Sequence, residues 1–388
     1  MIVALSGNAA VAYAMKQVNP DVVAVYPITP QTVAMERFAD YVADGEVDSE
    51  LIMADSEHSA MSCCIGASVA GGRVMTSTAS AGLALMWEML YVAASNRCPI
   101  VMNVMNRALS APINIHCDHS DAMGARDSSW IQIHAENCQE AYDNIIQAVR
   151  IAEHENVRLP VMTNMDGFTL SHATERLEVL EDGQIQKFVG EFNPMYPILD
   201  VDNPVTYGPL DLYDYYFEHK RQQVEAMELA HDVVVKIGEE YGKLSGRKYG
   251  KLEQYMCEDA DIGVLVLGST AGTARVAVRA MREKGIKAGL IKLRLFRPFP
   301  MEEVRNAVKG LKALAVMDRS DSFGAFGGPV FSEVRSALQG EDLEVTDYVY
   351  GLGGRDIRQD QIEQAIQETA QVVKTGKVKC YVNYLGVR

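Results

Sequence analysis

Short apolar runs alternate with segments of helical periodicity along the first 165 residues. The runs are rich in Val, Ile, Leu and Met, and the segments between them repeat apolar residues at helical spacing. The expected strands span residues 2–5, 22–26, 51–54, 73–76, 100–105 and 159–164. The expected helices span residues 9–18, 31–42, 57–70, 83–95 and 140–153. This alternation predicts a mostly parallel sheet with helices on both faces.

The alternation stops at about residue 168 and resumes at about residue 258. Between these points lie a turn at Glu181-Asp182-Gly183, prolines at 194, 197, 204 and 209, and a polar helix expected at 213–241. We interpret this stretch as a long connector, partly helical and partly extended over a surface. Strands are then expected at 262–267, 288–293, 313–317 and 344–348, and helices at 273–284, 301–309, 329–338 and 359–374. A second, smaller α/β domain is therefore predicted.

Composition and charge restrict the class of protein. A chain of 388 residues is long enough for two domains. Its net charge of −16 argues against nucleic-acid or anionic-membrane partners, because either would require a cationic face. No apolar run is long enough to span a bilayer, and the N-terminus lacks the basic region of a signal peptide. We therefore expect a cytoplasmic protein.

Seven cysteines at 63, 64, 98, 117, 138, 257 and 380 form no C-x-x-C pair, so neither a zinc ribbon nor an iron–sulfur cluster is supported. The loop His116-Cys117-Asp118-His119 holds four potential metal ligands. All four lie in one short loop without a second anchoring element, and a polar loop lining a pocket is the better interpretation.

Three segments with chemical potential each follow an expected strand: Tyr26 to Pro30, Asp55 to His58, and Asn106 to Asn114. In an open α/β sheet such strand ends converge on one crevice, so a hydroxyl, a carboxylate and a guanidinium could share it. Thr29 precedes a proline and fits a helix N-cap better than a substrate contact, although the two roles are compatible.

Glu57 has two interpretations. A carboxylate in the first turn of a helix is stabilised by the helix dipole, which is a structural role. A glutamate in an apolar crevice could instead exchange a proton with a heteroaromatic nitrogen, since desolvation raises a carboxyl pKa. Arg107 could bind a substrate carboxylate bidentately or form an ion pair with an aspartate of the next loop.

The glycine-rich segments Gly268 to Thr273, Gly324 to Gly328 and Gly351 to Gly354 follow expected strands. The first lacks the Gly-Lys of a P-loop and the G-x-G-x-x-G dinucleotide pattern. We interpret the first as a tight turn, whereas the other two could either touch a phosphate or simply turn.

The chain resembles the alpha chain of multi-subunit pyruvate:ferredoxin oxidoreductases over nearly its whole length. The resemblance rests on the three strand ends above and on Ser6-Gly7-Asn8, Trp130-Ile131-Gln132, Pro204 to Leu210, Phe217 to Gln222 and Gly351 to Asp356. It implies that residues 1–235, including the connector from about 168, form a thiamine-diphosphate pyrimidine-binding domain. Residues 255–388 would form a domain of the transketolase C-terminal type.

The resemblance also implies roles for individual residues. Glu57 should hydrogen-bond N1′ of the aminopyrimidine ring, and Pro27 and Ile28 should contact the same cofactor. Arg107 should hold the pyruvate carboxylate, and Thr29 should hydrogen-bond the substrate. The loop from Ile113 to Met123 would border the pocket.

The same family supplies other parts of the enzyme from separate chains. This sequence has no G-D-G followed by an asparagine to hold Mg²⁺ and the diphosphate, and no cluster cysteines. A beta subunit with the diphosphate half and a [4Fe–4S] cluster, a ferredoxin-like delta subunit and a gamma subunit are implied. The implied reaction converts pyruvate and coenzyme A reversibly to acetyl-CoA and CO₂, with electrons passing to ferredoxin. The alternatives are another 2-oxoacid (2-oxoglutarate, a branched-chain 2-oxoacid or oxalate) and a non-catalytic scaffold subunit.

Overall fold

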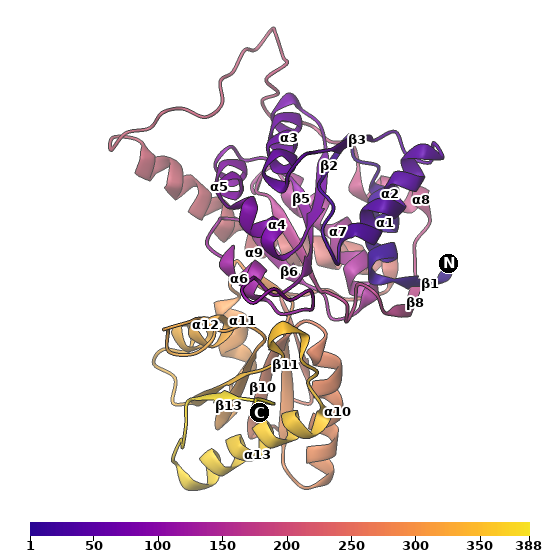
Figure 1. Ribbon diagram of the computed structural model, residues 1–388. Coiled ribbons are helices and arrows are strands. Elements are labelled where there is room, and N and C mark those ends of the chain that lie inside the picture. The colour runs from indigo at the N-terminus through magenta and orange to yellow at the C-terminus, as the bar shows by residue number, and fades with distance from the viewer.

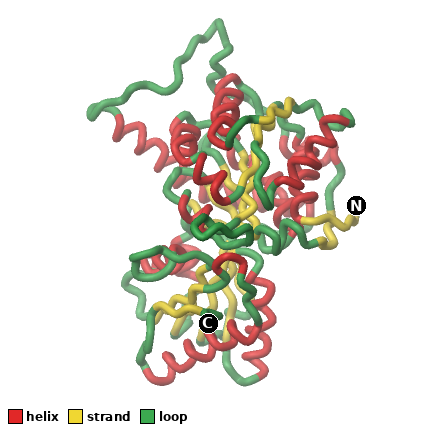
Figure 2. Tube along the Cα trace, viewed as in Figure 1, coloured by secondary structure: helices red, strands yellow, loops and turns green.

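The alternating pattern folds into two mostly parallel sheets, each flanked by helices (Figure 1). The computed structural model describes residues 1–388. The predicted α/β class is therefore confirmed. The sheets lie in separate halves of the molecule, joined by a long connector (Figures 1 and 2).

The larger sheet has the strand order β12-β6-β7-β5-β4-β2-β3. Its strands are β2 (Val22–Val25), β3 (Glu50–Met53), β4 (Val74–Thr78), β5 (Val101–Asn106), β6 (Ile131–His134), β7 (Val161–Asp166) and β12 (Leu295–Arg297). All pairs are parallel except that of β12 with β6. Strands β4 to β7 are buried along their whole length, as expected for strands covered on both faces.

Helices cover both faces of this sheet. They are α1 (Gly7–Val18), α2 (Thr32–Ala43), α3 (Glu57–Ala70), α4 (Ser80–Leu85), α5 (Trp87–Ser95), α6 (Ser120–Gly124) and α7 (Cys138–Glu153). The single helix predicted at 83–95 is two helices that meet at Met86. The strand predicted at 2–5 is β1 (Ile2–Ser6), which pairs antiparallel with β8 (Thr174–Glu178) outside the main sheet. Its alternate residues are only partly buried, as suits a small peripheral sheet.

The smaller sheet has the order β15-β14-β13-β10-β11-β9. Its strands are β9 (Leu252–Tyr255), β10 (Ile262–Leu267), β11 (Ala288–Leu293), β13 (Ala313–Asp318), β14 (Glu344–Val349) and β15 (Val382–Tyr384). Its helices are α10 (Thr270–Glu283), α11 (Met301–Ala307), α12 (Pro329–Ala337) and α13 (Gln359–Thr375), with a 3₁₀ turn at Leu352–Gly354. Only β9 runs antiparallel.

The connector contains two helices. The turn predicted at Glu181-Asp182-Gly183 is instead the start of α8 (Asp182–Val189), where Glu181 and Gln184 form a capping box. The long helix α9 (Tyr216–Ser245) packs its C-terminal half on the core of the first sheet.

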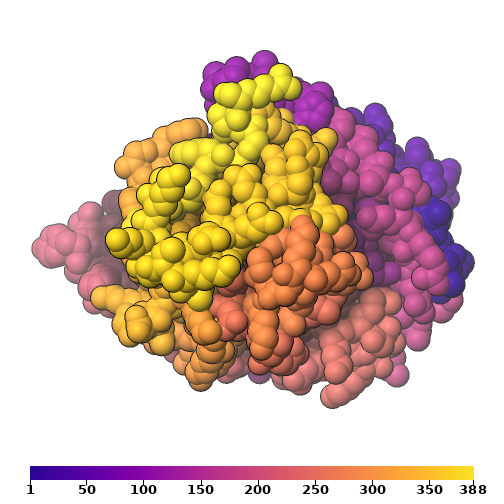
Figure 3. Space-filling model, turned by 90° about the horizontal axis from the view of Figure 1, so that it is seen from below, coloured from indigo at the N-terminus to yellow at the C-terminus, as the bar shows by residue number.

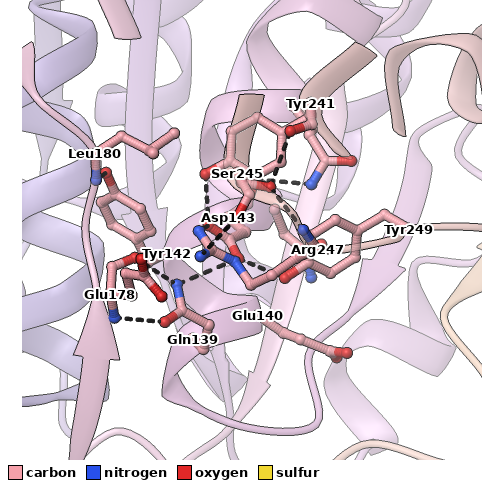
Figure 4. A network of polar contacts seen from close by, with 12 residues as sticks. Gln139, Glu140, Tyr142, Asp143, Glu178, Leu180, Tyr241, Ser245, Arg247 and Tyr249 are labelled. Atoms are coloured by element: carbon pink, nitrogen blue, oxygen red, sulfur yellow. Dashed lines mark hydrogen bonds and ion pairs between the residues drawn. The ribbon is translucent and has the colours of Figure 1, made fainter. Parts of the chain in front are cut away.

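A buried carboxylate holds the end of α9 against α7 (Figure 4). Asp143 accepts hydrogen bonds from the Tyr241 and Tyr249 hydroxyls. It also forms an ion pair with Arg247, whose Nε lies 2.6 Å from Asp143 Oδ2. Burial and the Asp143 charge raise the pKa of both tyrosines. The Asp143 carboxylate therefore fixes the exit of the connector to the first half of the molecule.

Further buried polar contacts join the two halves. Lys292 of β11 lies 2.8 Å from Glu136 and 2.5 Å from Glu140 near the start of α7. Strand β12, which follows β11 in sequence, crosses over and pairs with β6 at the edge of the first sheet. The second half thus contributes one strand to the first sheet. No helix is both long and apolar enough to cross a membrane.

Candidate active site

Parallel pairing brings the candidate side chains to one edge of the larger sheet. Strands β5, β4, β2 and β3 are adjacent and parallel, so their carboxyl ends face the same way. The predicted crevice at these ends is the position where open α/β sheets bind ligands.

Glu57 is the first residue of α3, and its side chain has no partner in the chain. Ser56 caps this helix by accepting the N–H of Ser59 at 3.2 Å. Glu57 is only 7% exposed, yet its carboxylate makes no hydrogen bond or ion pair within the chain. A largely buried carboxylate that has no donor within the chain can gain a hydrogen bond from a ligand. Glu57 therefore fits a ligand that supplies the missing donor.

Gly82 of α4 makes room for this carboxylate. A Cβ atom at Gly82 would lie 2.7 Å from Glu57 Oε1 and 2.5 Å from Thr78 Oγ1. Thr78 Oγ1 is itself buried and unpartnered. Sequence reasoning missed both Gly82 and Thr78, although the small residues that follow β4 were a usable signal.

Thr29 does not cap a helix, so the N-cap interpretation was wrong. Helix α2 begins at Thr32, and the side chain of Gln31 accepts the N–H of Ile28 at 3.1 Å. Thr29 is exposed and its hydroxyl makes no hydrogen bond in the chain. Its hydroxyl is therefore available to a ligand. Pro27 is likewise exposed, and Ile28 is partly buried.

Arg107 and Thr29 lie together, as the crevice hypothesis requires. Arg107 Nη1 donates to the Thr29 carbonyl at 2.9 Å, and Nε donates to the Asn114 carbonyl at 2.9 Å. Arg107 has no carboxylate partner, so the alternative of a structural ion pair was wrong. Its Nη2 makes no hydrogen bond within the chain. Arg107 is only 7% exposed, and its guanidinium with a free terminal nitrogen is suited to an anionic ligand.

Asp121 organises the backbone beneath these groups. Its carboxylate accepts the N–H of Arg107 at 3.0 Å, that of Ser80 at 2.9 Å and the Asn106 amide at 3.0 Å. Burial raises the pKa of Asp121 to about 6, against the opposing effect of these hydrogen bonds. Asp121 thereby ties the end of β5 to the start of α4. Sequence reasoning missed this role because its partners lie far apart along the chain.

A turn of the second half supports the loop that follows Arg107. Asn114 donates to the Gly353 carbonyl at 2.9 Å, and the Gly353 N–H donates to Asp118 at 3.1 Å. A Cβ atom at Gly353 would lie 2.5 Å from Asn114 Nδ2, and Gly353 has φ +61. The glycine turn at 351–354 therefore packs on this loop and fixes Asn114, whose carbonyl holds Arg107.

The potential metal ligands in the same loop are already engaged. The ligand atoms of Cys117, His119 and Asp166 lie within 4.8 Å of one another. However, Asp166 accepts His119 Nε2 at 2.7 Å and Arg319 Nη1 at 2.7 Å. Burial alone would raise the pKa of Asp166, but the charges of Arg319 and His119 hold it below its usual range. Burial also raises the pKa of the Cys117 thiol. The neighbouring guanidinium makes this cluster a poor cation site.

The other glycine-rich turns hold protein carboxylates. Ser269, in the turn after β10, donates its backbone N–H to Asp166 at 3.1 Å. The Gly328 N–H donates to Asp347 at 2.7 Å at the start of α12. Each turn donates a backbone N–H to an internal carboxyl group, as a tight structural turn does.

Comparison with known proteins identifies the family. Residues 13–239 match the sequence model described as "Pyruvate flavodoxin/ferredoxin oxidoreductase, thiamine diP-bdg". Residues 260–362 match "Pyruvate:ferredoxin oxidoreductase core domain II". The chain belongs to the pyruvate:ferredoxin oxidoreductase family. Its first half is therefore a thiamine-diphosphate-binding domain of that family.

Curated relatives match the chain over nearly its whole length. "Pyruvate synthase subunit PorA" of Thermotoga maritima is 54% identical over 388 residues, covering 100% of this chain and 98% of the relative. The protein of the same name from Methanocaldococcus jannaschii is 46% identical over 364 residues, covering 93% of each. "Ketoisovalerate oxidoreductase subunit VorA" of Pyrococcus horikoshii is 41% identical, covering 96% of this chain and 95% of the relative. These relatives are subunits, which implies a multi-subunit complex.

Solved structures share the fold at low sequence identity. The 2-oxoglutarate:ferredoxin oxidoreductase from Magnetococcus marinus gives a TM-score of 0.73 at 19% identity, with 95% of this chain and 65% of that chain covered. The chain thus spans about two thirds of that longer protein. A split-gene transketolase gives a TM-score of 0.55 at 13% identity, with 95% and 98% covered. At this sequence identity, both solved structures show only that the fold is shared.

Proposed function

We propose that this chain is the alpha subunit of a pyruvate:ferredoxin oxidoreductase of the pyruvate synthase type. The complex would convert pyruvate and coenzyme A reversibly to acetyl-CoA and CO₂, and pass the electrons to ferredoxin. One observation carries the proposal. The edge that presents an unpaired buried Glu57 also presents Arg107 with a free Nη2 and Thr29 with a free hydroxyl.

Glu57 is the group proposed to contact the cofactor. Its carboxylate lacks a hydrogen-bond donor in the chain, and Gly82 leaves room in front of it. These features fit the N1′ edge of an aminopyrimidine ring, and the neighbouring Pro27 and Ile28 would border the same ring. Thiamine diphosphate, when bound, supplies a carbon nucleophile and an electron sink for decarboxylation. Glu57 would hold a proton at N1′ and so act as a general acid–base group.

Arg107 and Thr29 are proposed to position the substrate. The two bonds from Arg107 to carbonyl oxygens orient its guanidinium and leave Nη2 for a substrate carboxylate. The Thr29 hydroxyl, adjacent to the carbonyl that Arg107 contacts, would donate to the substrate as well. The loop over residues 113–123, held by Gly353, would exclude water from one side of the pocket.

Partner chains would complete the enzyme. We assign Mg²⁺, the diphosphate half of the cofactor and the [4Fe–4S] clusters to beta and delta subunits, with a gamma subunit in the same complex. Residues 1–235 would be the pyrimidine-binding domain and residues 255–388 the transketolase-like domain. A cytoplasmic location is proposed from the seven cysteines, none of which forms a disulfide.

Two alternatives remain testable. Because a branched-chain relative is 41% identical to this chain, the substrate could be another 2-oxoacid. A scaffold subunit would need no unpaired carboxylate in the crevice, so Glu57 argues against that role.

The test is an anaerobic assay of the complex assembled by co-expression. Viologen-dye reduction would be measured with coenzyme A and each of pyruvate, 2-oxoglutarate, 2-oxoisovalerate and oxalate. The proposal predicts the highest kcat/KM with pyruvate and no turnover without coenzyme A. Preference for another acid would refute the substrate assignment. Absence of turnover with every acid from a fully loaded complex would refute the enzymatic role.

A further inference from the structure

The connector carries an exposed apolar segment that leaves the body of the molecule. We call residues 191–218 the arm. From its start to Tyr215 the arm contains no helix or strand, and it ends in the first turn of α9. It projects beyond the first half of the molecule in Figure 1, is drawn as loop in Figure 2, and forms the pink protrusion at the left of Figure 3.

Large apolar side chains are concentrated on this arm. Of the 29 exposed large hydrophobic residues in the chain, 11 lie on it. They are Met195, Tyr196, Ile198, Leu199, Val201, Leu210, Leu212, Tyr213, Tyr215, Tyr216 and Phe217. Tyr213 is 96% exposed and Phe217 is 77% exposed. Isolated exposed apolar residues are ordinary, but a contiguous group rich in tyrosine is typical of a protein interface.

The charge of the arm has a single sign. Its six charged residues are all acidic, and it contains no lysine or arginine. They are Glu191, Asp200, Asp202, Asp211, Asp214 and Glu218. A surface that receives the arm must therefore combine apolar contacts with a cationic border.

The base of the arm is held in place before any partner binds. The Ile198 N–H donates to the Val69 carbonyl of α3 at 2.8 Å, and the Tyr207 hydroxyl donates to the Tyr196 carbonyl at 2.7 Å. Pro194 and Pro197 pack against Gly71 at the end of α3. Proline and tyrosine lose little conformational entropy on docking, so the arm is pre-organised for binding. Helix α3 also carries Glu57 at its other end.

We propose that the arm docks into an apolar groove, bordered by lysine and arginine, on a different subunit of the complex. A second copy of this chain is a poorer partner. If the arms of two copies met at a two-fold axis, six acidic residues would face six, and a second copy also carries the same net charge of −16. The inference rests on the proposed function only in requiring that the chain works within a complex.

The test separates assembly from turnover. The full chain would be co-expressed with its partner chains as wild type, as Tyr213→Ser/Phe217→Ser, and as Asp202→Lys/Asp214→Lys. The matched controls are Val387→Ser and Asp342→Lys, which change exposed residues outside the arm. Subunit composition would be followed by mass photometry over a dilution series at low and high salt. Thermal unfolding of the purified full-length chain would check that each variant folds.

Both arm variants should raise the concentration at which the different subunits separate by about tenfold or more, while the controls stay near wild type. The lysine variant should also weaken the salt dependence of assembly. Unchanged subunit separation in both folded arm variants would overturn the proposal. Loss of self-association alone, with contacts to the other subunits intact, would also overturn it and assign the arm to a second copy. Neither outcome depends on 2-oxoacid turnover.

Discussion

The two sheets present acidic groups at their strand ends in opposite states. In the first half, Glu57 is buried and unpaired, and Arg107 keeps a nitrogen free. In the second half, Asp318 accepts the N–H groups of Val330 at 3.0 Å and Phe331 at 2.8 Å. There the neighbouring Arg319 is paired with Asp166. We call these the open edge and the closed edge.

The comparison shows that the same sheet architecture can serve ligand binding at one edge and stability at the other. Buried polar groups are normally satisfied within the chain, and at the closed edge both oxygens of Asp318 accept backbone N–H groups. An edge that gives a carboxylate no donor within the chain leaves that carboxylate for a ligand to bind. Changes at the closed edge should therefore lower stability, whereas changes at the open edge should lower activity.

The largest effect should come from breaking the ion pair that joins the two edges. Asp166→Leu leaves Arg319 buried without a partner, which typically destabilises a protein by about 3–5 kcal/mol. Urea unfolding of the full chain would measure this loss. The control Asp259→Ala breaks an exposed pair with Arg282 and should leave the midpoint almost unchanged. Equal midpoints for the two variants would contradict the structural role of Asp166.

Arg107→Lys should have the next largest effect. Lysine keeps the charge but cannot contact Thr29, Asn114 and a substrate together in the fixed geometry of a guanidinium. A charged hydrogen bond contributes about 1.5–3 kcal/mol, so kcat/KM for the 2-oxoacid should fall ~10- to 100-fold, mainly through KM. Arg97→Lys is a matched control, because Arg97 also donates to two backbone carbonyls. If both variants kept the wild-type KM, Arg107 would not bind substrate.

Gly353→Ala should have a smaller effect on the same site. The new methyl group would press on Asn114, and alanine at φ +61 is strained by about 1 kcal/mol. We expect KM for the 2-oxoacid to rise about fivefold. Gly285→Ala has the same backbone strain at φ +82 but open space around it, and should leave KM unchanged. Identical kinetics for the two variants would show that the glycine turn does not position Arg107.

A separate effect should be a slope in the pH dependence of stability. Burial raises the pKa of Asp347 to about 7, and burial together with Asp347 raises that of Asp318. The folded state thus binds more protons than the unfolded state between the unfolded pKa of about 4 and the folded value. Asp347 should therefore stabilise the fold most below about pH 4, and this contribution should be lost as pH rises toward about 7.

Asp347→Asn should flatten this slope in the free energy of unfolding between those pH values. Exposed Asp342→Asn is the control and should keep it. A variant slope equal to that of wild type would contradict the raised pKa of Asp347.

Local signals predicted much of the fold. The helix at Glu57–Ala70 and the strands at Ile262–Leu267 and Ala288–Leu293 were predicted with the bounds that the structure has. The helix cap marks where the helix begins, and a mostly apolar run marks the two ends of each strand. The short strands β6, β8, β9, β12 and β15 were missed, because strands of three to five residues depend on distant partners. The crossover of β12 to the first sheet has no local signal at all.

The site was predictable in part. Parallel alternation was enough to expect Thr29, Glu57 and Arg107 at one edge, and the contact between Arg107 and Thr29 agrees with that expectation. The N-cap at Thr29 was wrong because the chain turns through Gln31 before α2 begins. The link between Asp166 and Arg319 joins residues 153 positions apart, so only tertiary structure reveals it.

The most direct test of the open edge is Glu57→Gln in the assembled complex. Glutamine keeps the size of the side chain but removes the proton-transferring group. We predict a loss of ~100-fold or more in kcat, because general acid–base groups contribute about that much. Thermal unfolding and subunit composition should stay unchanged, since Glu57 has no partner within the chain. Wild-type turnover in Glu57→Gln, or a lost fold in place of lost activity, would contradict the account.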